Sequence, residues 1–427
     1  MDKTSFVIKG NLVYADAERK LHCEENSYLI CEQGEIIGTF ARLPEQFEKL
    51  PFYDHQNALV IPGMTDLHVH APQYTYRGMG MDCELLTWLE KYAFPEESRY
   101  QDTAYADRAY SIFTEDLQKS VTTRACMFAT IHNQATELLM DKMEKSGLVS
   151  FVGRVNMDRN GGVNLCEKSA AVSASETEEW IQETLHKYEC TKPILTPRFT
   201  PSCSDELMGY LGKLAAKYQL RVQSHLSENL SEIAWVKELV PTASCYGDAY
   251  SMFDMLGDEK YPAIMAHCVH STEPELELLK QHHTYIAHSP ESNMNVSSGI
   301  APIRKYLEYG LHTGLASDIA GGSSISIMKA ATQAIQVSKL YWRLVDQDAA
   351  PLTFADAFYL ATLGGGSYFG KVGSFQSGFE ADILVLDDSQ IRGAREFSLA
   401  ERMERAFYEE KDLCLKAKYV QGRRIVL

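Results

Sequence analysis

Histidine and acidic side chains in this sequence have spacings that suit a metal ion. His68 and His70 are two residues apart at the end of the apolar segment IPGMTDLHVH, residues 61–70. In a β-strand, residues i and i+2 point to the same face, so both imidazoles can reach one ion. The pair alone is weak evidence, because a chain with 13 histidines contains such pairs by chance and a hydrogen-bonded pair at a strand end has the same pattern.

Other metal-type ligands follow later apolar runs. His225, His267 and Asp318 each stand where such a run ends. The two histidines of the first run, His225 and Asp318 form a mixed nitrogen and oxygen set that suits zinc and leaves room for a water, with iron(II) as the second choice. The sequence contains no CxxC motif, so the thiolate ligands of a structural zinc site are missing and an open catalytic site is favoured.

Glu228 lies three residues beyond His225, near the expected metal without being required as a ligand. A carboxylate there can take a proton from an activated water and pass it to a leaving group; the alternative is a solvated acid at a helix N-terminus. Asp318 can bind the metal and also orient or deprotonate the water. His267 could be a further ligand or a donor to a developing oxyanion, and His270 competes for that role.

These residues need a fold that brings the ends of separate strands together. Apolar strand-like segments alternate with helical patterns, which predicts repeated βα units and a parallel sheet. The eight predicted strands cover residues 58–70, 121–130, 150–158, 194–202, 220–228, 263–270, 285–292 and 312–318. Helical patterns between them cover residues 175–188, 205–218, 274–282 and 303–309. Eight units over about 300 residues favour an α/β fold of the (β/α)8 TIM-barrel type, in which active sites form at the carboxyl ends of the strands.

An open doubly wound sheet is the alternative. It is disfavoured because no GxGxxG follows the first strand and no Walker-type GxxxxGK[ST] occurs. Both chain ends carry short β-type runs broken by glycines. If these ends pair, they form one small β-sandwich domain from residues 1–62 and 371–427, with the barrel at residues 63–370.

Composition excludes several classes of function. Lys and Arg number 41 and Asp and Glu 58, a formal charge of −17, so binding to nucleic acid or to a membrane surface is disfavoured. No apolar run approaches the roughly 20 residues that cross a bilayer. The N-terminal segment MDKTSFVIKG lacks the basic-then-apolar order of a signal peptide, and the ten cysteines are scattered, so we expect a cytoplasmic protein with reduced thiols.

Several segments resemble a known family. Residues 62–70 resemble the metal-binding signature of the amidohydrolase superfamily, and the later ligand positions follow in the order that superfamily uses. The chain ends resemble its β-sandwich, including the run GFEADI at residues 378–383. Four segments resemble the guanine deaminase family: HAPQY (70–74), LTWLEKYAFP (86–95), PRFTP (197–201) and SDIAGG (317–322). The resemblance covers essentially the whole chain.

The resemblance implies a function and a set of roles. It implies a homodimer that deaminates guanine to xanthine and ammonia with one zinc per chain. The implied metal ligands are His68, His70, His225 and Asp318. The implied catalytic residues are Glu228, Asp318 and His267, and the implied guanine contacts are Gln73, Arg198, Phe199, His267 and Glu228. The residue types fit, because Arg198 is a permanent donor for O6 and N7, Gln73 both donates and accepts, and Phe199 offers an apolar face.

Two other functions are alternatives to guanine deamination. A related deaminase or chlorohydrolase could act on another aminated ring, such as a pterin, an adenosine derivative or a triazine, and the pocket residues rather than the ligands would separate them. A non-catalytic scaffold is disfavoured, since the ligand positions and Glu228 are present.

The roles of several aromatic and imidazole side chains stay open. His132 and His288 also follow predicted strands, where each could line the pocket or be structural. Trp88, Tyr92 and Phe94 have near-helical spacing, which is more typical of a core than of a pocket wall.

Overall fold

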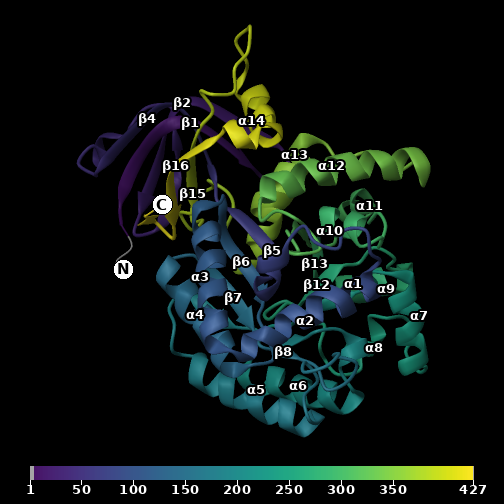
Figure 1. Ribbon diagram of the computed structural model, residues 1–427. Coiled ribbons are helices and arrows are strands. Elements are labelled where there is room, and N and C mark those ends of the chain that lie inside the picture. Colours follow the sequence, from purple (N-terminus) through teal and green to yellow (C-terminus); the bar gives the residue numbers. More distant parts are fainter. Residues whose placement is uncertain (1–3, 427) are drawn as a thin grey trace.

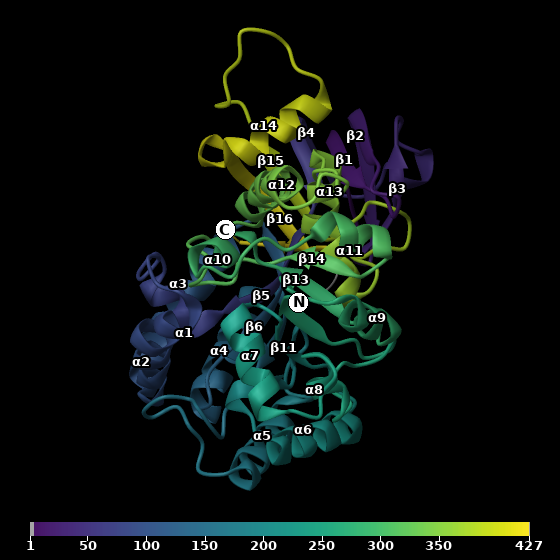
Figure 2. The same ribbon diagram turned by 90° about the vertical axis from the view of Figure 1, so that its right-hand side faces the viewer.

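The computed structural model describes residues 4–426, and its strands form a β-sandwich sheet from both chain ends and a parallel barrel between them. The β-sandwich (purple and yellow) lies above the barrel in both views (Figures 1 and 2). Its seven strands are hydrogen-bonded in the order β17-β16-β15-β4-β1-β2-β3. They are β1 (Phe6–Ala15), β2 (Leu21–Glu32), β3 (Glu35–Phe40), β4 (Phe52–Pro62), β15 (Ile383–Asp387), β16 (Cys414–Val420) and β17 (Arg423–Ile425). The predicted pairing of the two chain ends is confirmed.

This sheet curls over its own core. The rings of Phe6 in β1 and Tyr419 in β16 have centroids 4.8 Å apart, although β4 and β15 lie between these strands in the sheet. In a flat sheet, three strand spacings would separate them by about 14 Å. The segment before β15 also bonds to the β2–β3 turn, where the Ala381 N–H donates to the Gly34 carbonyl at 2.8 Å. The domain limits at residues 62–63 and 370–371 stay a prediction, and the limits at 1 and 427 lie outside the described residues.

The barrel is built from parallel pairs of short strands. They are β5 (Met64–His70), β6 (Thr122–Phe128), β7 (Val149–Gly153), β8 (Val155–Asn156), β9 (Thr191–Pro193), β10 (Thr196–Pro197), β11 (Gln223–Leu226), β12 (Ile264–His267), β13 (Tyr285–His288) and β14 (Thr313–Leu315). A parallel bridge between Leu195 and Val222 joins the two halves on one side. On the other side the Asp318 N–H donates to the His68 carbonyl at 2.9 Å, which closes the ring and confirms the predicted barrel.

Several predicted strands were too long. The strand predicted at 58–70 is two strands in different sheets, because the chain passes from the β-sandwich to the barrel at Gly63. A Cβ there would lie 2.2 Å from Thr123 Oγ1, so only glycine allows this approach to β6. The predicted ends at 198–202 and 289–292 instead enter the short turn η5 (Thr200–Ser202) and the helix α10 (Pro290–Asn295). Pro201, the second residue of η5, and Pro290, the first residue of α10, favour this ending of the extended segments.

Helices surround the barrel. The longer ones are α3 (Thr103–Lys119), α4 (Asn133–Ser146), α5 (Ala170–Thr184), α6 (Asp205–Tyr218), α7 (Leu230–Leu239), α9 (Glu273–Gln281), α11 (Ile303–Tyr309) and α12 (Ile327–Leu344). A further helix, α14 (Leu399–Tyr408), packs on β1 and β2 of the β-sandwich. Short helices are α1 (Leu85–Trp88), η3 (Leu89–Ala93), α2 (Phe94–Glu97), α8 (Asp248–Ser251) and α13 (Phe354–Tyr359). The predictions at 205–218 and 303–309 agree with α6 and α11. None of the helices between residues 4 and 426 has the length and apolar character that crossing a bilayer requires.

A buried ion pair joins the β-sandwich to the barrel. Arg124 of β6 donates from Nε to Asp382 Oδ2 at 2.7 Å and from Nη2 to Oδ1 at 3.0 Å. Both side chains are almost completely inaccessible to solvent. Arg124 Nη2 also donates to Glu380 at 2.8 Å, so the guanidinium is held by two carboxylates from the segment that leads into β15.

Replacing Asp382 by Asn is expected to lower the free energy of unfolding by about 3 kcal/mol or more, the range for removing one partner of a buried ion pair. The reason is that Arg124 would keep its charge in a buried place with one carboxylate fewer. Urea denaturation followed by circular dichroism measures the change. Asp387→Asn is the matched control, because Asp387 pairs with Lys416 at the more exposed end of β15, and it should barely move the transition midpoint. Equal midpoints for Asp382→Asn and wild type would contradict the role of the pair.

Candidate active site

The carboxyl ends of β5, β11 and β14 bring the predicted metal ligands together. His68 Nε2 lies 3.1 Å from Asp318 Oδ1, and His70 Nε2 lies 3.6 Å from the same oxygen. His70 Nε2 and His225 Nε2 are 3.1 Å apart. All four side chains are buried. Residues that are up to 250 positions apart in sequence therefore form one cluster, as the barrel requires.

The donor atoms fit a metal ion. Two ligand atoms bound to one zinc at 2.0–2.1 Å with tetrahedral angles lie about 3.3 Å apart, close to the spacings found here. His68 Nε2 is buried and makes no hydrogen bond within residues 4–426. His225 donates from Nδ1 to the Arg198 carbonyl at 2.6 Å, which leaves its Nε2 lone pair directed at the cluster. Oriented imidazoles and a carboxylate are typical ligands of zinc and also suit iron(II).

Asp66 fixes the two strands that carry three of these ligands. Its Oδ1 accepts from the backbone N–H of His68 at 3.2 Å and of Ser317 at 3.0 Å. The carboxylate therefore ties β5 to the residue before Asp318. Burial raises the pKa of Asp66 to about 7, although the hydrogen bonds from Ser317 oppose that shift.

The cluster has an electrostatic pattern that suits a cation. Burial, followed by the neighbouring imidazoles, holds the pKa of His70 and of His225 well below the usual range, so both rings are neutral. Burial alone would raise the pKa of Asp318, but the charge interaction and hydrogen bond with His68, followed by the interaction with His267, hold it well below its usual range. Neutral imidazoles and an ionised carboxylate are the protonation states that metal binding needs.

Glu228 and His267 lie beside the ligands. Glu228 Oε2 is 3.5 Å from His267 Nε2, and Glu228 Oε1 accepts from Ser298 Oγ at 2.9 Å. His267 donates from Nδ1 to Asn293 Oδ1 at 2.8 Å. Burial raises the pKa of Glu228 to about 7, with the carboxylates of Glu232 and Asp318 adding to the shift and His267 opposing it. A carboxyl group that titrates near neutrality can both accept and deliver a proton.

The structure separates His267 from its competitor His270. His270 donates from Nε2 to the Ser298 carbonyl at 2.7 Å and lines a different cavity, behind α7. His267 Nε2 is 3.7 Å from Asp318 Oδ2, so His267 is the one that reaches the cluster. The choice of His267 for an oxyanion contact is therefore sterically reasonable, and its role stays a prediction.

A pocket opens above the cluster; the space between its atoms, open solvent included, is about 430 Å³. It is lined by three of the five side chains predicted to contact guanine, namely Gln73, Arg198 and Phe199. The pocket is also lined by His70, His225, Glu228, His267, Asp318, Leu85, Trp88, Leu89, Ser292 and Val296. Trp88 thus belongs to the pocket wall, whereas Tyr92 and Phe94 are not among its lining residues in the described chain.

Glu97 lies behind the pocket lining and binds two of the residues that line it, a contact that the sequence did not reveal. Its carboxylate accepts from Arg198 Nη1 at 2.5 Å, from Arg198 Nη2 at 2.9 Å and from Gln73 Nε2 at 2.7 Å. It is the last residue of α2 and only 1% exposed. Its partners are 24 and 101 residues away, so no local pattern indicated the contact.

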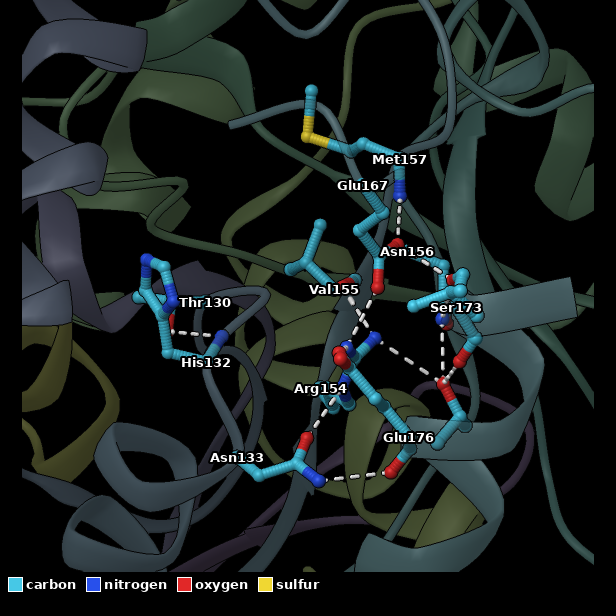
Figure 3. A network of polar contacts seen from close by, with 12 residues as sticks. Thr130, His132, Asn133, Arg154, Val155, Asn156, Met157, Glu167, Ser173 and Glu176 are labelled. Carbon is cyan, nitrogen blue, oxygen red and sulfur yellow. Dashed lines mark hydrogen bonds and ion pairs between the residues drawn. The ribbon is translucent and has the colours of Figure 1, made fainter. Parts of the chain in front are cut away.

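A second polar network is centred on Arg154 (Figure 3). Arg154 is completely buried and donates from Nη2 to Glu167 Oε1 at 2.6 Å. Glu167 Oε2 accepts from the Met157 N–H at 2.9 Å. The Met157 sulfur lies 4.0 Å from Arg198 Nη1, so the network fixes the segment on which Arg198 packs.

His132 and His288, whose roles the sequence left open, do not line the pocket. His132 sits beside the Arg154 network, where its N–H donates to Thr130 Oγ1 at 3.1 Å (Figure 3). His288 is buried at the end of β13, and burial lowers its pKa to about 3. Neither is among the residues that line the pocket, within the part of the chain that the structure describes.

Comparisons with known proteins agree with this geometry. Residues 59–425 match the amidohydrolase family. A guanine deaminase of Dictyostelium discoideum is 39% identical over 380 residues, which cover 87% of this chain and 83% of that protein. A guanine deaminase of Mus musculus is 37% identical over 98% of this chain and 93% of its own length. A crystal structure of guanine deaminase from C. acetobutylicum, with guanine bound in its active site, is 43% identical with a TM-score of 0.95 and covers 99% of this chain and 100% of that one.

Proposed function

The chain belongs to the amidohydrolase family and, within it, to the guanine deaminases, and we propose that it hydrolyses guanine. In this reaction guanine and water give xanthine and ammonia. One observation carries the proposal most strongly. A His and Asp metal-binding cluster forms the floor of a pocket whose wall presents Arg198, Gln73 and Phe199. The metal-binding cluster suits the attack of water on an unreactive ring carbon, and the wall residues suit a flat base with hydrogen-bond acceptors on its edge.

We assign one zinc ion per chain to His68, His70, His225 and Asp318, with iron(II) as the second choice. When bound, such an ion lowers the pKa of water toward neutrality and so supplies hydroxide at ordinary pH. His225 is held for this purpose by the Arg198 carbonyl, and Asp318 by the backbone hydrogen bond that closes the barrel.

Glu228 is the proposed proton carrier. Its Oε2 would accept one proton from the attacking water as oxygen adds to C2 of guanine, while Asp318 helps to orient that water. Glu228 would then deliver the proton to the exocyclic nitrogen, and the bond from C2 to that nitrogen would break to release ammonia. Ser298 holds the other carboxylate oxygen at 2.9 Å, so one oxygen stays directed at the reacting atoms.

The pocket wall would hold the base. Arg198 would donate to O6 and N7, and Gln73 would contribute its amide beside Arg198, since both side chains donate to Glu97 Oε1. Phe199 presents an apolar face, and its ring lies 6.3 Å from that of Trp235, which supports it from behind. His267 would donate to the oxygen or ring nitrogen that gains charge during addition.

A direct assay tests the function. Zinc-loaded protein is mixed with guanine, adenine, cytosine, guanosine or a pterin, and ammonia release is followed together with the ultraviolet spectrum of the product. We expect turnover of guanine to xanthine in clear preference to the other rings. Turnover of another ring without guanine would keep the hydrolytic site but overturn the roles given to Gln73 and Arg198.

We also propose that the chain forms a homodimer, as the family resemblance implies, and that it is cytoplasmic, as its ten scattered cysteines indicate. Light scattering of the purified protein is the measurement, and twice the monomer mass is the expected result.

A further inference from the structure

The hydrogen bonds of buried Glu97 to Arg198 and Gln73 indicate a role in the selection of the ligand, in addition to holding these two side chains in place. We propose that Glu97 is a positioning and specificity-determining residue: it orients Gln73 and Arg198 and neutralises Arg198, so that the pocket prefers an uncharged base over an anionic one. This inference rests on the proposed deamination of guanine. It concerns the selection of substrate and the release of product rather than the chemical step.

Glu97 fixes which groups of Gln73 face the pocket. Gln73 Nε2 donates to Glu97 Oε1 at 2.7 Å, and Gln73 Oε1 accepts from the Ala320 N–H at 2.9 Å. A flipped amide would place its oxygen against the carboxylate and its NH₂ against the Ala320 N–H. One amide N–H and one lone pair of Gln73 therefore remain for a ligand, in a fixed arrangement.

The same carboxylate fixes the guanidinium plane of Arg198. Each terminal nitrogen of Arg198 gives one hydrogen to Glu97, in the bidentate geometry that holds a guanidinium most rigidly. A guanidinium has five N–H donors, so donors remain for a base. Phe94 lies three residues before Glu97, and its ring centroid is 5.1 Å from the Arg198 guanidinium carbon. The short helix α2 thus supplies both a carboxylate and an aromatic face to one arginine.

Charge is the second part of the argument. Arg198 is 2% exposed and Glu97 1% exposed, so water screens neither of them effectively. Together they are neutral. Without Glu97, a permanently charged guanidinium would face the pocket and attract anions. Xanthine carries a carbonyl where guanine carries an amine, which makes its ring N–H more acidic, so an uncompensated Arg198 would retain the product anion.

The primary test is Glu97→Gln, with kcat, KM, zinc content and inhibition by xanthine measured at mildly alkaline pH. We expect kcat/KM for guanine to fall about 10- to 100-fold, mostly through KM, because a carboxamide NH₂ would meet the N–H donors of Arg198 or Gln73. Inhibition by xanthine should become several-fold tighter. A purely structural role would weaken the binding of both rings alike, so tighter xanthine binding is the distinguishing result.

A matched control and a double-mutant cycle complete the experiment. Glu96→Gln changes the neighbouring acid, whose partners are Tyr105 and Arg99, and should leave kcat/KM unchanged. In an Arg198→Met background, Glu97→Gln should no longer tighten the binding of xanthine, because that effect requires the charge of Arg198. Additive effects of the two substitutions would overturn the inference.

Two outcomes separate this inference from the proposed function. If wild-type protein does not deaminate guanine, the proposed function is wrong. If wild type is active and Glu97→Gln has the same KM and the same xanthine inhibition, only the inference is wrong. If Glu97→Gln does not fold, Glu97→Asp replaces it, since it keeps the charge but withdraws the oxygens by one methylene. It should then raise KM without tightening xanthine binding, and an unchanged KM would overturn the inference.

Discussion

Glu228→Gln is expected to keep its metal and its fold while losing about 10³-fold in kcat, within the range for a general acid–base residue. The amide has nearly the same shape as the carboxyl group and can still accept from Ser298. It cannot take a proton from water or return one to the departing nitrogen. Stopped-flow or steady-state assays with guanine measure kcat, and metal analysis of the same samples shows whether the ligand cluster is intact.

The control for this substitution is Glu238→Gln on the adjoining helix α7. Glu238 is an exposed acid, whereas Glu228 is buried beside His267. The control should match wild type in kcat and in zinc content. A fully active Glu228→Gln protein would contradict the proton-carrier role and would leave Asp318 as the remaining carboxylate of the cluster.

The metal ligands could be predicted because each follows an apolar strand pattern, and a barrel brings the ends of its strands to one place. His68 and His70 share a strand face by their spacing, and the carboxyl ends of parallel strands meet at one end of the barrel. His225 and Asp318 each follow a recognisable apolar run, so the sequence indicated a common site without any knowledge of the distances. Spacing alone did not separate His267 from His270. The family resemblance favoured His267, and the structure gives the physical reason, since His270 turns toward the Ser298 carbonyl.

Other features could not be predicted from local pattern. Glu97 binds Arg198 of the pocket lining because α2 carries it to that side chain, which is 101 residues away in the sequence. The break at Gly63 depends on the closeness of Thr123, which apolar periodicity does not reveal. Strand ends were overestimated for a related reason. Residues 198–202 and 289–292 directly continue apolar runs, but Phe199 is the last extended residue before η5 and Ser292 already lies in α10, and both line the pocket.

The second large effect is expected from loss of the metal. Dialysis against a strong chelator should remove all measurable turnover of guanine, and stoichiometric zinc should restore it. His225→Ala should reproduce the loss permanently, at least about 10³-fold in kcat, because one ligand and its anchored orientation disappear together. Metal analysis before and after dialysis gives the stoichiometry, for which we expect one ion per chain.

Thermal unfolding provides a second readout that does not depend on activity. A ligand that binds only the folded state stabilises it in proportion to the logarithm of its concentration over Kd, so zinc should raise Tm of the dialysed wild type. His225→Ala should show a much smaller rise. His132→Ala is the matched control, since His132 is the N-cap residue of α4 and does not line the pocket, and it should retain both the zinc-dependent Tm shift and turnover. If chelated wild type kept full activity and an unchanged Tm, the cluster at the carboxyl ends of β5, β11 and β14 would not be a metal site.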